Sequence, residues 1–134
     1  MFKEKITYVN IDGEEVTETF YFNFTQAEAT EFNLKVIGDK PIENYVQALV
    51  EARNYGELVT IFKELILATY GEKIDGRFVK YKNGIRLADY FAATEAYSWL
   101  FNKLATDDKY AAEFVNKVTP AATQPSVPSS VKEA

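Results

Sequence analysis

One stretch, residues 54–69, limits what this chain can fold into, because its apolar side chains recur at helical spacing around most of a helix. A helix with so wide an apolar surface needs neighbours on several sides, so we expect it at the centre of the fold. Asn54, with Glu57 three residues later, predicts the helix start as a capping box. Gly71 predicts its end, because glycine readily adopts the left-handed conformation just past a last turn. The stripe expected to face the core is Leu58, Ile61, Phe62, Leu65, Ile66 and Thr69.

The composition suits one domain that binds neither nucleic acid nor membrane. The chain has 134 residues, and 47% of them are hydrophobic, which is enough for a true core. A net charge of −5 without any basic run argues against a nucleic-acid partner. No apolar run approaches the roughly 18 residues that cross a bilayer, and the first residues lack the apolar core of a signal peptide. We therefore expect a cytoplasmic protein.

Residues 2–24 have the pattern of a β-hairpin. Two segments with strand-like alternation flank Asp12-Gly13, a pair that suits a tight turn. Phe20 and Phe22 lie on the same face of the second strand. Because a two-stranded ribbon is marginal alone, this aromatic face covers either the chain's own helices or another polypeptide. The pattern favours the first use and leaves the second open.

Residues 25–118 carry helical patterns and are interrupted by one charged, glycine-containing stretch at 71–84. We expect five to six helices packed as a bundle. Thr25 and Glu28 have capping-box spacing and predict the start of the first helix. Thr106 is expected to cap the last one.

The stretch 71–84 is expected to be a structured surface loop, with a turn at Asp75-Gly76. It is either an ordinary connection or a recognition loop. Phe78 and Tyr81 support the second alternative, because exposed aromatic side chains in loops are often used for binding.

The fold class predicted from these patterns is α+β, mainly α: an N-terminal β-hairpin, a bundle of five to six helices and a disordered C-terminal tail. Residues 1–119 are expected to form a single globular domain, with the hairpin at 2–24 and the helical part at 25–118. Proline and small polar residues dominate from Pro120 onward, and no large apolar side chain is available to anchor this segment. Residues 120–134 are therefore expected to be disordered.

The sequence offers little for catalysis. It has no His and no Cys, so the commonest general base, the thiolate nucleophile and zinc–sulfur sites are missing. The tight acidic pair Asp107-Asp108 suits the first turn of a helix, and a metal or acid–base role is the weaker alternative. Trp99 is expected to anchor its helix rather than to stack on a ligand. We therefore expect no enzyme activity, no cofactor and no metal.

Five segments occur in the same order as in one known family and span nearly all of residues 3–118. They are F-Y-F-N-F-T-Q-A-E (20–28), I-F-K-E-L-I-L-A-T-Y-G-E-K (61–73), D-G-R-F-V-K (75–80), T-E-A-Y-S-W-L-F (94–101) and A-A-E-F-V-N (111–116). Together they resemble the tail assembly chaperones of long-tailed, siphovirus-type phages and prophages of Gram-positive bacteria.

The resemblance implies a non-catalytic protein of phage tail morphogenesis. Such chaperones bind the tape measure protein, keep it soluble and help recruit tail tube subunits, which are copies of the major tail protein. The resemblance also implies a location in the host cytoplasm and absence from the mature virion. Many members have a longer form made by ribosomal frameshifting, and self-association into a homo-oligomer is a further expectation.

The alternative is a structural tail component, such as a tube or connector subunit. The helix-rich pattern argues against it, because tube subunits are built mainly of strands. The residues predicted to contact a partner are Phe20 and Phe22 on the hairpin and Phe78 and Tyr81 in the loop.

Overall fold

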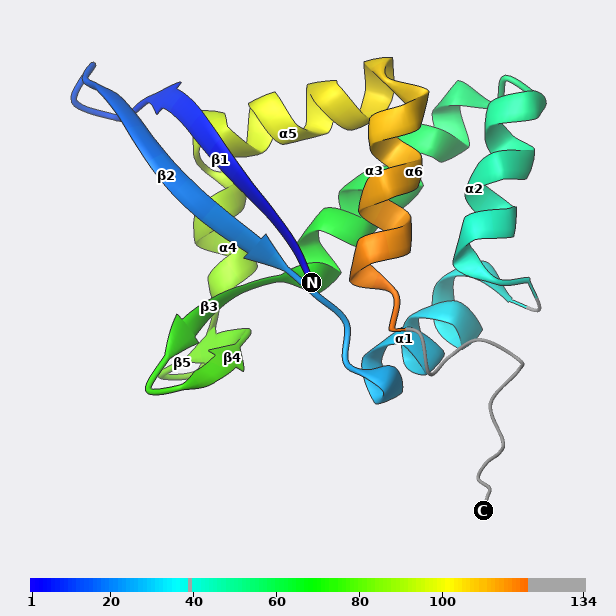
Figure 1. The fold of residues 1–134 in the computed structure, drawn as a ribbon, viewed down its shortest axis with the longest axis horizontal. Helices are drawn as coiled ribbons and strands as arrows, with labels where there is room; N and C mark the ends of the chain where they lie inside the picture. Colours follow the sequence, from blue (N-terminus) through cyan, green and yellow to red (C-terminus); the bar gives the residue numbers. More distant parts are fainter. Residues whose placement is uncertain (39, 121–134) are drawn as a thin grey trace.

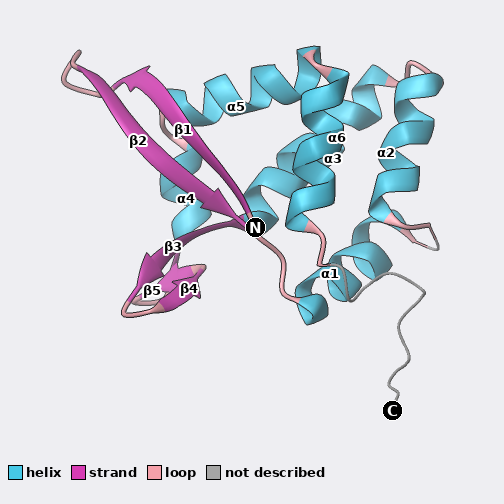
Figure 2. Cartoon of the chain, in the orientation of Figure 1, coloured by secondary structure: helices cyan, strands magenta, loops and turns pink. Residues whose placement is uncertain are grey.

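The computed structural model describes residues 1–38 and 40–120 and has the predicted α+β, mainly α architecture (Figures 1 and 2). Of the tail predicted at 120–134, all residues except Pro120 lie outside the described part. No helix in the described part is both long and apolar enough to cross a membrane. In chain order the elements are β1 (Phe2–Val9), β2 (Glu15–Phe22), α1 (Gln26–Phe32), the π-helical turn η1 (Asn33–Ile37), α2 (Ile42–Glu51), α3 (Tyr55–Thr69), β3 (Tyr70–Ile74), β4 (Arg77–Val79), β5 (Tyr81–Lys82), β6 (Ile85–Arg86), α4 (Leu87–Ala92), α5 (Glu95–Thr106) and α6 (Asp108–Val118).

The predicted N-terminal hairpin is present. β1 and β2 pair antiparallel over their full length, with Phe2 opposite Phe22, and Gly13 has a φ of 79° in the turn between them. The four-stranded sheet has the order β1-β2-β3-β4, but β3 pairs with only two residues of β2, Tyr21 and Phe22. The turn half of the hairpin is therefore a two-stranded ribbon, and Figure 1 shows it extending beyond α4 and α5.

Helix α3 is central, as its apolar circumference predicted, and it contacts α2, α4 and α5. All six residues of the predicted stripe are buried. Asn54 caps its start by accepting a hydrogen bond from the Glu57 N–H at 3.3 Å. The predicted left-handed end at Gly71 is wrong, because the chain enters β3 directly at Tyr70. The Asn23 N–H bonds the Thr69 carbonyl at 2.8 Å, which satisfies the helix end without a glycine cap.

Glycine is needed at position 71 because there is no room for a side chain, and not because a helix cap requires it. A Cβ at this position would lie 2.8 Å from the carbonyl oxygen of Val79 and 2.7 Å from the ring of Phe78. The close approach of β4 to β3 therefore requires glycine in the strand.

The aromatic face of the hairpin packs on the chain's own helices. The Phe22 ring lies 5.6 Å from the rings of Phe91 in α4 and Phe114 in α6, and 5.7 Å from Tyr70. The Phe20 ring lies 5.0 Å from Phe91. In this conformation the hairpin face is thus part of the core and not a free surface.

The stretch 71–84, expected to be a loop, is built from short strands. Asp75 and Gly76 have φ values of 51° and 78° and form the expected turn, between β3 and β4. Asn83 and Gly84, with φ values of 53° and 76°, form a second turn, between β5 and β6. Asp, Asn and Gly all tolerate a positive φ. Turns of this kind match the twist of antiparallel strands.

The start of the last helix also differs from the prediction. Helix α5 continues through Thr106, whose hydroxyl donates to the Asn102 carbonyl at 2.7 Å, so Thr106 is not the cap. Asp107 is the N-cap of α6 and accepts from the Tyr110 N–H at 3.1 Å. That hydrogen bond lowers the pKa of the Asp107 carboxyl. The acidic pair therefore serves the helix start, as predicted.

Candidate functional site

A groove of about 330 Å³ lies between α1, the last turns of α3 and the short strands β5 and β6, and we call it the α1 groove. Apolar residues from four segments line it. Charged side chains of both signs line it as well. The apolar residues are Phe24, Phe32, Val36, Leu67 and Ala68, and the charged or polar ones are Glu28, Glu31, Lys35, Lys80, Tyr81 and Arg86.

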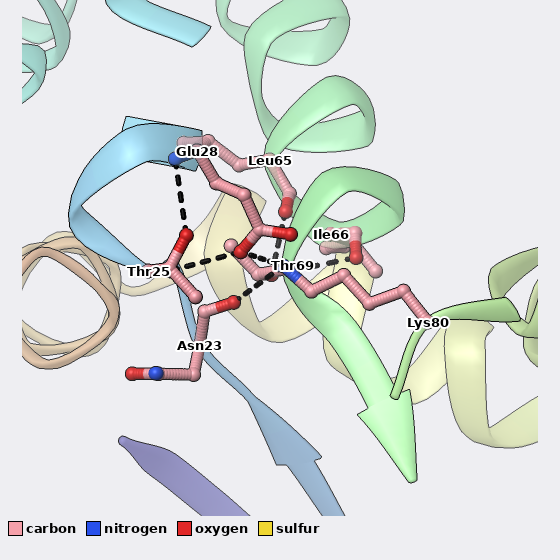
Figure 3. Close-up of polar contacts among 7 residues, drawn as sticks. All are labelled: Asn23, Thr25, Glu28, Leu65, Ile66, Thr69 and Lys80. Atoms are coloured by element: carbon pink, nitrogen blue, oxygen red, sulfur yellow. Dashed lines mark hydrogen bonds and ion pairs between the residues drawn. The ribbon is translucent and has the colours of Figure 1, made fainter. Parts of the chain in front are cut away.

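A capping box positions the α1 side of the groove (Figure 3). The Glu28 N–H donates to the Thr25 hydroxyl oxygen at 3.1 Å, and the Thr25 N–H donates to the Glu28 carboxylate at 2.8 Å. The two bonds satisfy donors that a helix start otherwise leaves without partners, which explains why α1 begins here. They also hold the Glu28 carboxylate toward the β4–β5 region.

Lys80 ties the opposite side of the groove to this helix start (Figure 3). Its ammonium group donates to the Glu28 carboxylate at 2.8 Å and to the Asn23 carbonyl at 2.7 Å, and it lies 5.3 Å from the centre of the Phe24 ring. The Leu87 N–H in turn donates to the Lys80 carbonyl at 2.9 Å. One largely buried lysine thus connects the β2–α1 link, α1, the β4–β5 region and α4.

Burial and pairing shift the pKa of each member of this ion pair in opposite directions. The Lys80 side chain is only 14% exposed, and loss of hydration lowers its pKa although Glu28 acts the other way. The Glu28 side chain is 38% exposed. Partial burial works to raise the pKa of Glu28, but the hydrogen bonds from Lys80 and Thr25 outweigh it and lower that pKa. The net effect favours the charged form of Glu28 and disfavours the charged form of Lys80.

Three exposed side chains with apolar or aromatic surface lie in or beside the groove. Tyr81 is 63% exposed, Val36 is 41% exposed and Leu34 is 71% exposed. Leu34 lines an adjoining depression that shares Glu31 and Lys35 with the groove. An open apolar surface with a mixed charged rim suits contact with another polypeptide.

The four residues predicted to contact a partner have different locations. Phe22 is fully buried and Phe20 is 9% exposed, so both belong to the core. Phe78 is partly buried, with its ring over Gly71. Tyr81 lines the groove, and the other three do not. Partner binding by Phe20 and Phe22 stays a prediction, and it requires the hairpin to move away from α4 and α6.

Sequence reasoning missed Leu34 and Val36 of η1. The sequence signal was two apolar residues, just before Gly38, that do not fit the apolar spacing of α1. Both are exposed in the structure. A π-helical turn has a wider period than an α-helix, so these side chains leave the apolar stripe and point to the surface.

The sequence raised two further candidate sites, a metal site and Trp99. Within residues 1–38 and 40–120, no group of three or more His, Cys, Asp or Glu side chains could hold a metal ion. Trp99 is 37% exposed and packs edge-on against Tyr110 at 6.3 Å, in keeping with a helix anchor.

Comparison with known proteins gives one match. A family model described as phage tail assembly chaperone matches residues 1–133. No curated protein and no solved structure matches the chain. The matched region contains both the hairpin and every helix that lines the α1 groove.

Proposed function

The chain belongs to a family of phage tail assembly chaperones, and we propose that it binds the tape measure protein, keeps it soluble and helps recruit tail tube subunits. Proteins of this family are in general not enzymes. We further propose that the phage is of the long-tailed siphovirus type with a Gram-positive host, and that the chain acts in the host cytoplasm and is absent from the mature virion.

The observation that carries this proposal is the set of exposed apolar side chains around the α1 groove. Leu34, Val36 and Tyr81 expose apolar surface that the described part of the chain leaves uncovered. An amphipathic helix of the partner can place its apolar stripe in such a groove, with anchors at helical spacing. The rim also carries Glu31 and Lys35, an exposed ion pair at 2.7 Å, beside the polar side of that helix.

Tyr81→Ser tests the groove, and the chain provides a matched control. Tyr90 in α4 is 61% exposed, close to the 63% of Tyr81, but it does not line the groove. The tape measure protein of the same phage is co-expressed with each variant, and its soluble fraction and pull-down yield are measured. We expect Tyr81→Ser to weaken binding roughly tenfold, because an aromatic anchor is worth about 1–2 kcal/mol or more at an interface. Tyr90→Ser should behave like the natural chain.

Two outcomes contradict the proposal. The tape measure protein could stay insoluble with the natural chain, or both Tyr variants could bind equally well. Mass spectrometry of purified virions then separates a chaperone from a structural tail component, because a chaperone should be missing from the particles.

A further inference from the structure

Strand β2 has an open outer edge. The Asn10 N–H donates to the Glu14 carbonyl at 2.8 Å, and this pair fixes the alternation of the hairpin. Residues with even numbers in β2 bond β1, while residues with odd numbers direct their N–H and C=O groups away from it. The odd-numbered residue Tyr21 is the one that meets Gly71 of β3. Within the described part of the chain, the outward backbone groups of Glu15, Thr17 and Thr19 have no strand beside them.

Natural proteins usually protect such an edge with a proline, a lysine, a bulge or a very short strand. β2 has eight residues, pairs with β1 in unbroken register and contains neither Pro nor Lys. The side chains of Glu15, Thr17 and Thr19 are exposed, and the hairpin end extends beyond the helices (Figure 1). The edge is thus accessible and regular, and the only charged side chains of β2, Glu15 and Glu18, are acidic.

The charge around this edge indicates what it can bind. Residues 10–20 contain four acidic side chains and no basic one, in a chain whose net charge is −5. The turn end also carries Ile11, which is 100% exposed, and Val9, which is 51% exposed. A strand that lies along the edge therefore meets acidic side chains at its turn end, whereas Lys5 of β1 lies opposite Thr19 farther along. Apolar surface flanks the same turn end. The acidic side chains are Asp12, Glu14, Glu15 and Glu18.

We propose that the β2 edge binds an extended, Lys- or Arg-containing segment of a tail protein, which joins the sheet in line with β3. Main-chain hydrogen bonds to Glu15, Thr17 and Thr19 supply affinity, and the acidic side chains select basic segments. The class of partner rests on the proposed function. This contact surface uses elements other than those of the α1 groove, so the two can be tested separately.

Thr17→Pro tests the edge directly. The Thr17 N–H points away from β1, so proline removes a donor that the hairpin does not use. The probes are overlapping 15-residue peptides that cover the tape measure and major tail proteins of the same phage. We expect basic peptides to bind the natural chain. They should bind Thr17→Pro roughly tenfold more weakly, because the hydrogen bond from the Thr17 N–H is lost and the adjacent main-chain hydrogen bonds are weakened.

Thr7→Val in β1 is the matched control. It removes the hydroxyl that lies 2.7 Å from the Thr17 hydroxyl but leaves every backbone group of the β2 edge in place, so binding should stay unchanged. Glu15→Lys should weaken the binding of basic peptides because it replaces an attractive charge by a repulsive one. Hydrogen exchange on the natural chain adds a readout that needs no variant: the Thr17 and Thr19 amides should exchange fast when free and slowly in the complex.

The inference is overturned if no peptide binds, if Thr17→Pro and Thr7→Val bind alike, or if these amides gain no protection. Self-association that protects the same amides also overturns it, because the occupant would be a second copy. Solubilisation that depends on Tyr81 without protection of the β2 edge refutes this inference and leaves the proposed function intact. Peptide binding at the edge without solubilisation of the tape measure protein refutes only the proposed function.

Discussion

Replacement of Lys80 by methionine removes the charge that joins the helix start of α1 to the β4–β5 region. Methionine keeps most of the volume of the side chain, so the change tests the ammonium group and not the packing. The carbonyl of Asn23 and the carboxylate of Glu28 each lose a donor, at 2.7 and 2.8 Å.

The size of the effect follows from burial. A hydrogen bond to a charged group contributes about 1.5–3 kcal/mol, but Glu28 is 38% exposed and can regain water. The variant also avoids the cost of burying the Lys80 ammonium, which is 14% exposed. We therefore expect a net loss of about 2 kcal/mol in the free energy of unfolding, and a fall of roughly 6–12 °C in Tm for a domain of this size.

The loss should depend on pH. The pKa of Glu28 is lowered from its ordinary value of 4.5, so the folded state binds the Glu28 proton less readily than the unfolded chain does. The stabilisation is complete above that ordinary value and disappears as the pH falls through the lower pKa of the folded state. The difference between Lys80→Met and the natural chain should therefore shrink on acidification from pH 7 to pH 3.

Urea unfolding followed by circular dichroism at both pH values measures this difference. Lys82→Met is the control, because Lys82 is an exposed lysine of the neighbouring strand β5. A change below about 0.5 kcal/mol for Lys80→Met at pH 7, the usual range for surface substitutions, would refute the reasoning. A difference that stays equal at pH 3 would refute the role of the carboxylate.

Two further predictions concern the core and the second hairpin. Phe22→Ala should cost about 3–5 kcal/mol in urea unfolding, because the ring is fully buried; a loss below 1 kcal/mol would mean that the hairpin is not packed on the helices. Gly71→Ala should cost about 1–3 kcal/mol and speed amide exchange in β3 and β4, because the new Cβ meets the Val79 backbone oxygen at 2.8 Å; unchanged exchange rates would contradict this.

Periodicity and cap chemistry predicted the elements that are long or have a local signal. The stripe of α3, the turn at Gly13 and the capping box of Thr25 and Glu28 are properties of residues close in sequence, so each could be recognised before the structure. Asn83-Gly84 has the same turn chemistry as Asp75-Gly76. It was missed because β5 and β6 have two residues each, too few to show any alternation.

The rest depends on contacts between distant segments. Phe20 and Phe22 show the same alternation whether they face a partner or the core. Their contacts with α4 and α6 in the structure show that they face the core. The role of Gly71 comes from the approach of Val79, and the role of Lys80 from a carboxylate 52 residues away. Tyr81 could be predicted as a surface aromatic, but its place in a groove requires α1 beside it.

The first strand and the last helix hold each other. The Phe2 ring lies 4.9 Å from Phe114, and the Tyr110 hydroxyl donates to the Glu4 carboxylate at 2.6 Å across 106 positions of sequence. During translation the hairpin is made first and α6 follows all the other helices, so Phe2 meets Tyr110 and Phe114 only when α6 has been made. Phe20 and Phe22 can pack earlier on Tyr70 and Phe91, so closure of the core around Phe2 is the late step of biosynthesis.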